Sequence, residues 1–398
     1  MKIALVHDYI KEYGGAERVL EALHELYPKA PVFTSVYLPS YLGPHKARFK
    51  DWDIRTSWLQ YIPFKAKLIS PFRLLSPSAF RSFSAKGGPA FGWDFSGYDV
   101  VISSATGAYF PNTLTKKRAK LICYCHTPPR YLYGYATARE WKKNAIFRVL
   151  GAVANHILRM VDYKASKNVD YYIANSEEVA GRIRKFYRKE ATVIYPPVDL
   201  AASKLASSVQ LENRELNANQ LDASYYLAGG RLARPKHIDL IVDACLELDV
   251  PLKIFGKSFA GYGDELKSQI ANLPRRQAGR KLQIEFLGEV TDEEKWELMR
   301  SAKAYINASE DEDFGILPVE AMAAGTPVIA YRSGGVKETV VDGETGLFFE
   351  ELTMESLTRA IKKFEKMKFN AKSCWKRAEL FSKEQFMKQI EAFLISKA

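Results

Sequence analysis

The stretch from Glu310 to Gly346, EDEDFGILPVEAMAAGTPVIAYRSGGVKETVVDGETG, decides how the rest of the chain is interpreted. An apolar run at 304–308 precedes it and predicts a buried strand, and a second run at 328–330 predicts the next strand. Between them the pattern predicts a helix over 318–324, because a proline suits its first turn and Gly325 marks its end. The stretch therefore predicts a strand, a helix and a second strand.

The backbone ahead of this helix is a predicted anion site. The N–H groups of Gly315, Ile316 and Leu317 would point out of the helix start, where negative charge is favoured. Glu312 lies just before them, and Glu320 lies eight residues further on, within the helix. A bound diphosphate would then have a carboxylate near each group that it joins, and carboxylates accept paired hydrogen bonds from sugar hydroxyls. The pattern indicates a nucleotide-sugar site.

The acidic residues also have two simpler interpretations. Acidic side chains near a helix N-terminus often only complement the helix dipole, which is worth about 0.3–1 kcal/mol each, and this applies to Glu310, Asp311 and Asp313. Asp311 and Asp313 also have the D-x-D form that can bind a divalent ion. Because the helix start and Glu320 already supply a phosphate and sugar site, we expect no metal and no other cofactor.

The order of these residues resembles the signature of family 4 retaining glycosyltransferases. Phe314-Gly315 lies between the two glutamates, EAMAAGTPVIA begins at Glu320, and the GGxxE and DGxxG segments at 334–338 and 342–346 belong to the same pattern. The resemblance implies an α/β protein of the GT-B fold, with two Rossmann-like domains facing across a cleft. It also implies that Glu312 positions the transferred sugar, that Glu320 binds the ribose, and that Phe314 belongs to the donor site.

The composition is that of an ordinary globular protein. The 398 residues suffice for two domains, and 47% are hydrophobic and 26% charged. The four cysteines show neither a C-x-x-C pair nor zinc-ligand spacing, which indicates reduced thiols in a cytosolic protein. The start, MKIALVHDYI, turns polar too soon for a secretion signal, and no run approaches the ~20 apolar residues that span a bilayer. We expect a cytoplasmic protein that can associate with the inner face of the plasma membrane.

The net charge of +12 is unevenly distributed. Residues 1–199 hold 30 Lys and Arg against 16 Asp and Glu, whereas residues 200–398 hold 28 against 30. A basic half suggests an anionic partner, either nucleic acid or the anionic cytoplasmic leaflet. The sequence shows no recognition helix or stacking platform, so we expect no nucleic acid.

Residues 46–86 combine basic and aromatic side chains and contain almost no acidic residue after Asp53. This mixture suits an anionic membrane interface, where rings lie among headgroups and cations meet lipid phosphates. It is equally compatible with a pair of amphipathic helices packed on their own domain. We predict that this segment contacts anionic membrane.

The first half begins with a predicted strand at 2–6, a Gly-Gly pair and a helix at 16–26, a unit that commonly approaches a phosphate. The G-x-G-x-x-G fingerprint of dinucleotide enzymes is absent, and a Gly-Gly pair is often only a turn. In the resembled family a loop here approaches the donor diphosphate and the acceptor. The resemblance therefore implies Gly15 at the donor and Asp8 at the acceptor, unless Asp8 only orients the loop.

His126 follows a predicted strand at 120–124, at the sheet edge where open α/β sheets bind ligands. The segment HTPPR resembles the H-x-P-x-R of related transferases, in which the histidine lies near the transferred sugar. The resemblance places His126 in the active site, and Arg130 and Tyr131 near the acceptor.

The second half carries a similar pair of cations. Arg231 and Lys236 follow a Gly-Gly pair and match the family's G-R-x4-K spacing, in which both cations hold the donor diphosphate. Surface cations at a turn are more often only solvated. Gly256, Gly288 and Val290 lie at the tips of two later predicted strands, where related enzymes hold the nucleoside base largely through backbone groups. The identity of the base therefore leaves no trace in the sequence.

The segment YPPVD at 195–199 is stiff and is the candidate linker. We expect an acceptor-side domain at 1–195 and a donor-binding domain at 200–375, with a loop at 200–222. The C-terminal segment 376–398, with a helix around 384–395, is expected to pack back on the first domain.

The resemblance implies a retaining hexosyltransferase that moves a sugar from a nucleotide diphosphate sugar to a hydroxyl of a saccharide or lipid-linked acceptor. Glu312, Lys236, Arg231 and His126 would carry catalysis, with the two cations stabilising the departing diphosphate. The segments HDY, GGAER and HTPPRYLY resemble mannosyltransferase-like members, which favours GDP-mannose and a role in bacterial polysaccharide or lipopolysaccharide assembly. The alternatives are a sugar-nucleotide epimerase or phosphorylase of the same fold and, more distantly, a nucleic-acid-binding protein.

Overall fold

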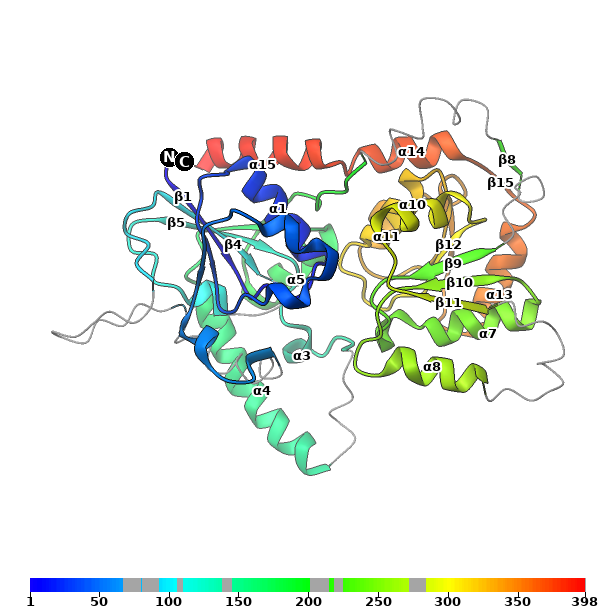
Figure 1. Cartoon of the computed structure of the whole chain (residues 1–398), viewed down its shortest axis with the longest axis horizontal. Coiled ribbons are helices and arrows are strands. Elements are labelled where there is room, and N and C mark those ends of the chain that lie inside the picture. Colours follow the sequence, from blue (N-terminus) through cyan, green and yellow to red (C-terminus); the bar gives the residue numbers. More distant parts are fainter. Residues whose placement is uncertain are drawn as a thin grey trace. The chain divides into compact units, whose positions relative to one another are not determined.

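The computed structural model of the chain describes residues 1–66, 80, 93–105, 110–137, 145–200, 215–217, 225–271 and 284–397. These residues form two compact units (Figure 1). The first unit holds residues 1–135, 145–197 and 384–397, and the second holds residues 136–137 and 198–383. The division after Pro197 falls inside the YPPVD segment.

The first unit is built on a parallel sheet of seven strands in the described part of the chain. They are β1 (Ile3–His7), β2 (Val32–Thr34), β3 (Ile54–Thr56), β4 (Val100–Ala105), β5 (Lys120–Cys125), β6 (Tyr171–Ala174) and β7 (Ala191–Val193), in the order β3-β2-β1-β4-β5-β6-β7. The strand order reverses between β1 and β4. In open α/β sheets such a reversal is where ligands bind, beyond the carboxyl ends of the strands.

Both faces of this sheet are buried, because successive side chains on a strand point to opposite faces. Ala4 and Val6 belong to one core and Ile3 and Leu5 to the other. The first core is covered by α4 (Ala145–Ser166) and α5 (Glu177–Tyr187), and the second by α1 (Gly15–Leu26) and α15 (Lys383–Lys397). The shorter elements are α3 (Arg130–Tyr133) and the 3₁₀ turns η1 (Pro39–Tyr41), η2 (Gly43–Phe49), η3 (Trp58–Tyr61) and η4 (Phe110–Thr113).

The last helix returns to the first unit later than residue 376, where the sequence analysis placed the return. Phe386, Ile390 and Phe393 of α15 are buried in the core that also contains α1. The preceding helix, α14 (Ala371–Glu379), remains in the second unit, where Cys374 and Ala378 are fully buried and α14 packs against α11. Residues 376–383 therefore belong to the second unit.

The second unit repeats the same design. Its parallel sheet consists, among the described residues, of β9 (Tyr226–Gly229), β10 (Leu252–Phe255), β11 (Ile284–Gly288), β12 (Tyr305–Asn307), β13 (Val328–Tyr331) and β14 (Gly346–Phe349), in the order β11-β10-β9-β12-β13-β14. The reversal lies between β9 and β12. The helical elements are η6 (Arg234–Lys236), α7 (Ile238–Leu248), α8 (Tyr262–Ala271), α10 (Asp292–Arg300), α11 (Ile316–Ala323), α12 (Val336–Thr339), α13 (Met354–Phe364) and α14.

Two local expectations from the sequence need correction. The helix expected from Pro318 begins two residues earlier, because Gly315 adopts a left-handed φ of 91° and caps it. The segment 200–222, expected as a loop, includes the strand β8 (Glu215–Asn217), which pairs antiparallel with β15 (Lys368–Asn370). Its other residues from 201 to 222 lie outside the described residues.

The described part of the segment 46–86 is not a pair of amphipathic helices. Up to residue 66 it forms the end of η2, then β3 and η3, and β3 is an edge strand of the sheet. Phe80 is fully buried, and the remainder of the segment lies outside the described residues. No helix in the described ranges combines the length and the apolar character needed to cross a membrane.

Candidate functional site

Two loops meet at the carboxyl edge of the second sheet, where the strand order reverses. One loop follows β9 and carries η6, and the other follows β12 and leads to α11. The Glu310 N–H donates to the Pro235 carbonyl at 2.8 Å, which joins the two loops. The Tyr305 hydroxyl donates to the carbonyl of Gly229, the last residue of β9, at 2.9 Å and so fixes the strand end from which the first loop starts to β12. The loops predicted to hold the diphosphate and the sugar are therefore neighbours.

An ion pair links the predicted catalytic residues of these loops. Nζ of Lys236 lies 2.5 Å from Oε2 of Glu312, and the two side chains are 28% and 15% exposed. Beside this pair, Nε2 of His237 lies 3.4 Å from Oε2 of Glu310. The two loops thus present a cation and a carboxylate that already neutralise each other and that remain partly accessible.

Two glycines fix the backbone of Glu312. The Gly335 N–H donates to the Glu312 carbonyl at 2.7 Å. A Cβ atom on Gly334 would lie 2.0 Å from that same carbonyl oxygen, and Gly334 has a φ of 68°. Only glycine satisfies both demands. The GGxxE segment therefore supports the carboxylate loop from behind.

The start of α11 has the geometry of an anion site. Gly315 is its N-cap, so the first N–H groups of the helix, including those of Ile316 and Leu317, have no acceptor within the helix. Gly230 has a φ of 104°, and a Cβ atom there would lie 2.5 Å from Leu317 Cδ1. The Phe314 ring is buried and packs edge-on against Phe381 at 5.5 Å, so its side chain supports the loop.

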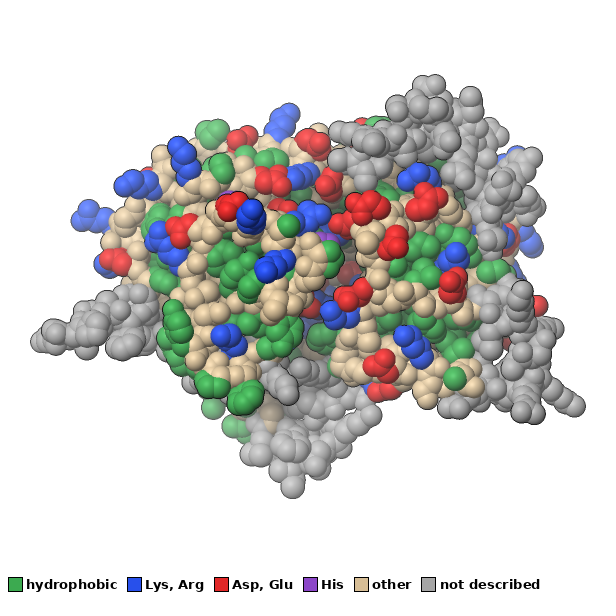
Figure 2. All heavy atoms as spheres, viewed as in Figure 1, with side chains coloured by type: hydrophobic (Ala, Val, Ile, Leu, Met, Phe, Trp, Pro, Cys, Tyr) green, Lys and Arg blue, Asp and Glu red, His purple; other side chains and the backbone are tan. Residues whose placement is uncertain are grey.

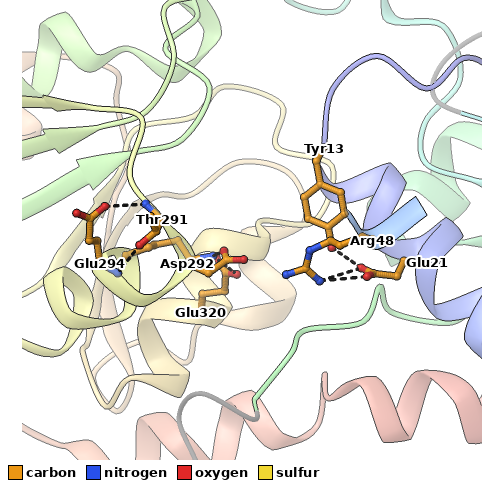
Figure 3. Close-up of polar contacts among 8 residues, drawn as sticks. Tyr13, Glu21, Arg48, Thr291, Asp292, Glu294 and Glu320 are labelled. Carbon is orange, nitrogen blue, oxygen red and sulfur yellow. Dashed lines mark hydrogen bonds and ion pairs between the residues drawn. The ribbon is translucent and has the colours of Figure 1, made fainter. Parts of the chain in front are cut away.

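Glu320 has a partner that the sequence analysis missed. Its Oε1 lies 2.8 Å from Nζ of Lys295, and Lys295 also contacts Oδ1 of Asp292 at 3.1 Å. The Glu320 and Lys295 side chains are only 2% and 8% exposed. Figure 3 shows Glu320 directed toward Asp292 near the start of α10, where Thr291 and Glu294 form a capping box. The sequence signal near Lys295 is TDEE at 291–294, which is typical of a helix start but does not indicate a contact with Glu320.

The tips of β9, β10 and β11 are in backbone contact. The Gly256 N–H donates to the Gly288 carbonyl at 2.6 Å, and a Cβ atom on Gly256 would lie 1.8 Å from the Gly230 carbonyl oxygen. Val290, two residues beyond β11, is partly exposed. The three predicted donor loops therefore form a continuous edge of backbone.

Arg231 lies in the same loop as Lys236 and is exposed. Its guanidinium lies over the Phe259 ring, 5.2 Å from the centroid. The neighbouring Arg234 is engaged elsewhere, since it forms an ion pair with Glu265 of α8 at 2.6 Å. This arrangement leaves the two family-matching cations in one loop and separates Arg234 from them.

At the corresponding edge of the first unit, a chain of polar side chains includes His126. Nε2 of His126 lies 2.9 Å from Oγ of Ser104, which in turn lies 3.1 Å from Nδ1 of His7. Nε2 of His7 is 3.6 Å from Oε1 of Glu17. Burial, together with the nearby His7, lowers the pKa of His126 to about 3, so the ring is neutral at physiological pH. The sequence analysis identified His126 but neither Ser104 nor Glu17.

The glycine loop after β1 is braced from two sides. Gly15 is the first residue of α1, and Gly14 is its N-cap. The Gly14 N–H donates to Oε2 of Glu17 at 3.0 Å. Figure 3 shows Tyr13 and Arg48 converging on Glu21, to which both donate hydrogen bonds. Tyr13 is thereby attached to α1 and to η2, and the loop has a fixed course.

Asp8 is fully buried, and its carbonyl accepts hydrogen bonds from the backbone and the hydroxyl of Ser35. These contacts use the main chain of Asp8, so the role of its carboxylate stays a prediction. Arg130 and Tyr131 form the first turn of α3 and are partly exposed. The preceding Thr127 accepts a hydrogen bond from the buried Arg182 at 3.1 Å, which anchors the HTPPR segment to α5.

The acidic segment 311–313 shows no sign of a metal site. In the described part of the chain, no three or more His, Cys, Asp or Glu side chains are grouped so that they would hold a metal ion. Glu312 is paired with Lys236, as described above, and the Asp311 N–H donates to Oγ of Ser333 at 3.2 Å.

Comparison with known proteins identifies two families along the chain. Residues 13–202 match the family model described as Glycosyltransferase Family 4, and residues 209–381 match the model described as Glycosyl transferases group 1. An alpha-1,3/1,6-mannosyltransferase ALG2 from Dictyostelium discoideum is 27% identical over 279 residues, which cover 63% of this chain and 64% of that protein. The lipopolysaccharide core biosynthesis mannosyltransferase LpcC from Rhizobium leguminosarum bv. viciae is 33% identical over 204 residues, covering 49% and 54%. The matches thus span about half to two-thirds of these relatives.

The fold has a solved counterpart over its full length. The Anabaena protein Alr3699/HepE, crystallised with UDP and glucose, superposes with a TM-score of 0.66 at 20% identity and covers all of both chains. This agreement extends over both parallel sheets and confirms the two-domain α/β architecture predicted from the sequence. Since the two family matches follow one another over most of the sequence, the chain belongs to glycosyltransferase family 4, the group 1 glycosyl transferases, and has their GT-B fold.

Proposed function

We propose that this protein is a retaining hexosyltransferase that moves a sugar from a nucleotide diphosphate sugar to a hydroxyl of a saccharide or lipid-linked acceptor. The observation that carries the proposal is the contact between Lys236 and Glu312 next to the start of α11. These groups can bind both parts of a sugar diphosphate: the cation and the helix N-terminus bind the diphosphate, and the carboxylate binds the sugar.

In the proposed reaction the bond between the sugar and the diphosphate breaks, and negative charge builds on the departing diphosphate. Arg231, Lys236 and the N–H groups at Gly315 to Leu317 would stabilise that charge. One such preorganised donor can be worth about 2.7–4 kcal/mol of barrier. Glu312 would hold the sugar hydroxyls, and the hydroxyl of the acceptor would give its proton to the leaving phosphate. No metal is needed in this scheme.

Glu320 is the proposed ribose ligand. Its carboxylate is held by Lys295 from the side of α10, which restricts its rotamers before any ligand arrives. Gly256, Gly288 and Val290 would hold the base through backbone groups, and the contact between Gly256 and Gly288 supports a shared edge there. We favour GDP-mannose as the donor, because the matched segments of ALG2 and LpcC belong to mannosyltransferases.

We further propose that the acceptor is presented at an anionic membrane surface, as expected for a step in polysaccharide or lipopolysaccharide assembly. Tyr61 and Phe64, from the basic segment 46–86, are 84% and 79% exposed, and Trp58 is 39% exposed. Amphipathic rings at the surface of a basic unit suit a membrane interface. Figure 2 shows green apolar side chains at the surface of the first unit, on its lower side in this view.

A second element of the first unit carries exposed apolar side chains. Val153, Ile157 and Met160 are more than half exposed and follow one another on α4 at the spacing of one helix face. Lys164 and Lys167 are exposed just beyond them. An apolar face that continues into cations fits insertion among acidic headgroups, so α4 extends the proposed membrane contact beyond residues 46–86. The enzyme would then work at the inner face of the plasma membrane.

The experiment that tests the donor proposal is a thermal titration. A nucleotide that binds the folded state raises Tm in proportion to the logarithm of its concentration. We expect GDP to raise Tm more than UDP does. When the protein is incubated with GDP-mannose and a lipid extract, we expect the sugar to be transferred to the lipid. No shift with either nucleotide would contradict the proposal. Epimerised or hydrolysed donor without transfer would instead favour an epimerase or phosphorylase.

A further inference from the structure

Four polar side chains from four parts of the first unit lie in a row, three of them buried and His126 partly exposed. Glu17 lies on α1, His7 ends β1, Ser104 lies on β4, and His126 follows β5. His7 and Ser104 face each other in register across the point where the strand order reverses. The His126 N–H donates to the Ala105 carbonyl at 3.0 Å, which fixes the backbone of His126 beside β4.

The Ser104 hydroxyl restricts where the two imidazole rings can carry their protons. A serine hydroxyl has one hydrogen to donate and two lone pairs that accept, and a neutral imidazole has one N–H and one bare nitrogen. Ser104 Oγ contacts Nδ1 of His7 and Nε2 of His126, so its one hydrogen can go to only one of these nitrogens. If a bare Nδ1 of His7 takes that hydrogen, Nε2 of His126 must carry the N–H.

Glu17 supplies a charge beside the His7 ring. Its Oε2 accepts the Gly14 N–H at 3.0 Å, so the carboxylate is held with Oε1 3.6 Å from Nε2 of His7. This distance is too long for a hydrogen bond, and within the described residues the buried Nε2 of His7 has no hydrogen-bond partner. The nearby carboxylate favours electrostatically the tautomer of His7 with its N–H on Nε2. Nδ1 of His7 then accepts the hydrogen of Ser104, and the Ser104 oxygen accepts the N–H on Nε2 of His126.

We propose that Glu17, His7 and Ser104 are positioning residues that fix His126 in the Nε2–H tautomer, so that its Nδ1 is a hydrogen-bond acceptor for a hydroxyl of a sugar bound at the carboxyl edge of the first sheet. This rests on the proposed function above. His126 is partly exposed past the carboxyl end of β5, and within the described residues its Nδ1 has no hydrogen-bond partner. A bare nitrogen at this place selects sugars with a hydroxyl there and rejects analogues that lack one.

The tautomer is directly measurable in the full-length protein without any substrate. Two-bond ¹H–¹⁵N correlation spectra of ¹⁵N-histidine-labelled protein distinguish Nε2–H from Nδ1–H, and the His126 signals are those lost in His126→Asn. We expect the Nε2–H pattern for His126 in the wild type. An Nδ1–H pattern would overturn the proposal.

The variant Glu17→Gln tests whether the Glu17 charge sets the tautomers. Its amide can keep the Gly14 contact and present an NH₂ group to His7, so that Nε2 becomes the bare nitrogen of His7 and its Nδ1 carries the N–H. The Ser104 hydrogen is then available to Nε2 of His126, which should raise the Nδ1–H fraction of His126. We expect kcat to fall about tenfold, the equivalent of one lost hydrogen bond, while the Tm shift with nucleoside diphosphate is retained. Glu25→Gln is the matched control, since Glu25 lies exposed on the same helix and should change neither the tautomer nor kcat.

A second variant removes the Ser104 hydroxyl, which connects the two histidines. In a Ser104→Ala background, Glu17→Gln should no longer alter the His126 tautomer, because the connecting hydroxyl is absent. An undiminished effect there, or an unchanged tautomer in the Glu17→Gln single variant, would refute the proposal. If the nucleotide failed to raise Tm, that result would count against the proposed donor site. It would not affect the tautomer result, which is measured without any nucleotide.

Discussion

The Lys236 ammonium lies 2.5 Å from the Glu312 carboxylate, and the two residues come from loops that follow different strands, β9 and β12. In this state the cation proposed for the diphosphate is neutralised by the carboxylate proposed for the sugar. A donor that places its diphosphate against Lys236 would release Glu312 to accept hydrogen bonds from sugar hydroxyls. The ion pair therefore couples recognition of the two parts of the donor.

Replacing Lys236 by alanine should lower kcat by roughly 100-fold or more, because one preorganised donor to a developing charge is worth about 2.7–4 kcal/mol. Initial rates of sugar transfer at saturating donor measure this effect. Arg234→Ala is the matched control, since Arg234 lies in the same loop but pairs with Glu265 of α8, and it should stay within about twofold of wild type. Near-normal turnover in Lys236→Ala would discredit the charge argument.

Glu312→Gln should separate binding of the diphosphate from catalysis. Without the competing carboxylate, Lys236 is available to the phosphates, and a partly exposed pair of this kind is worth up to about 1 kcal/mol. We expect calorimetry to show a nucleoside diphosphate binding up to about fivefold more tightly, while kcat falls because the sugar loses its ligand. Weaker binding of the bare diphosphate would contradict the coupling.

The sequence was most informative where a local pattern determines structure. A proline near a helix start, glycines at its ends and short apolar runs located the strands and helices around the site to within two residues. The α11 start was misplaced because Gly315 takes a left-handed φ, which no spacing rule reveals. Lys295 was missed since its contact with Glu320 depends on α10 packing against α11, a relation between segments 25 residues apart. Ser104 was missed because a serine in an apolar strand carries no local signal.

Glu320→Ala should cost stability as well as donor affinity. It leaves the buried Lys295 with Asp292 alone, and breaking a buried ion pair typically costs about 3–5 kcal/mol. The retained Asp292 contact should keep the loss below that range in denaturant unfolding. The double variant Lys295→Met/Glu320→Gln should recover part of it, because the buried charges of Lys295 and Glu320 are both removed and Asp292, which loses its Lys295 contact, is 32% exposed.

The control for this prediction is the exposed pair between Lys257 and Glu289, whose side chains are 68% and 65% exposed. Lys257→Ala should change the free energy of unfolding by less than about 1 kcal/mol. If Glu320→Ala were as mild as Lys257→Ala, the Lys295 contact would not be an important part of the fold.

Asp162 of α4 should make stability depend on pH. It is buried and accepts hydrogen bonds from the Tyr133 hydroxyl of α3 at 2.6 Å and the Tyr187 hydroxyl of α5 at 3.2 Å. Burial raises its pKa from 3.8 to about 7. Between these values the folded state keeps a proton that the unfolded state has lost, so stability falls as pH rises from about 4 to 7 and then levels off.

Asp162→Asn removes this titration, so its Tm should exceed that of the wild type by more at pH 8.5 than at pH 5. Differential scanning calorimetry at the two pH values gives the comparison. Asp53→Asn serves as the control, because Asp53 is an exposed carboxylate of the same unit paired with Arg55. An equal Tm difference at both pH values would show that Asp162 is not the titrating group.

The triple change Val153→Ser, Ile157→Ser and Met160→Ser on α4 should weaken binding to anionic vesicles. Each of these side chains is more than half exposed, so the substitutions remove apolar contact with lipid at little cost to the core. Burying apolar surface contributes roughly 25 cal/mol per Å², so losing three such side chains should lower the partition coefficient at least tenfold.

Sedimentation with sucrose-loaded vesicles of phosphatidylglycerol and phosphatidylcholine measures the effect, and wild type should bind the acidic vesicles far better at low salt than at high salt. Leu380→Ser with Ile395→Ser is the matched control, since these residues are 55% and 80% exposed on other elements and should leave binding unchanged. Equal sedimentation of the wild type with acidic and neutral vesicles would exclude charge as the attraction. If the wild type were a dimer and the triple variant a monomer with vesicle binding intact, α4 would instead be a contact between two copies of this chain.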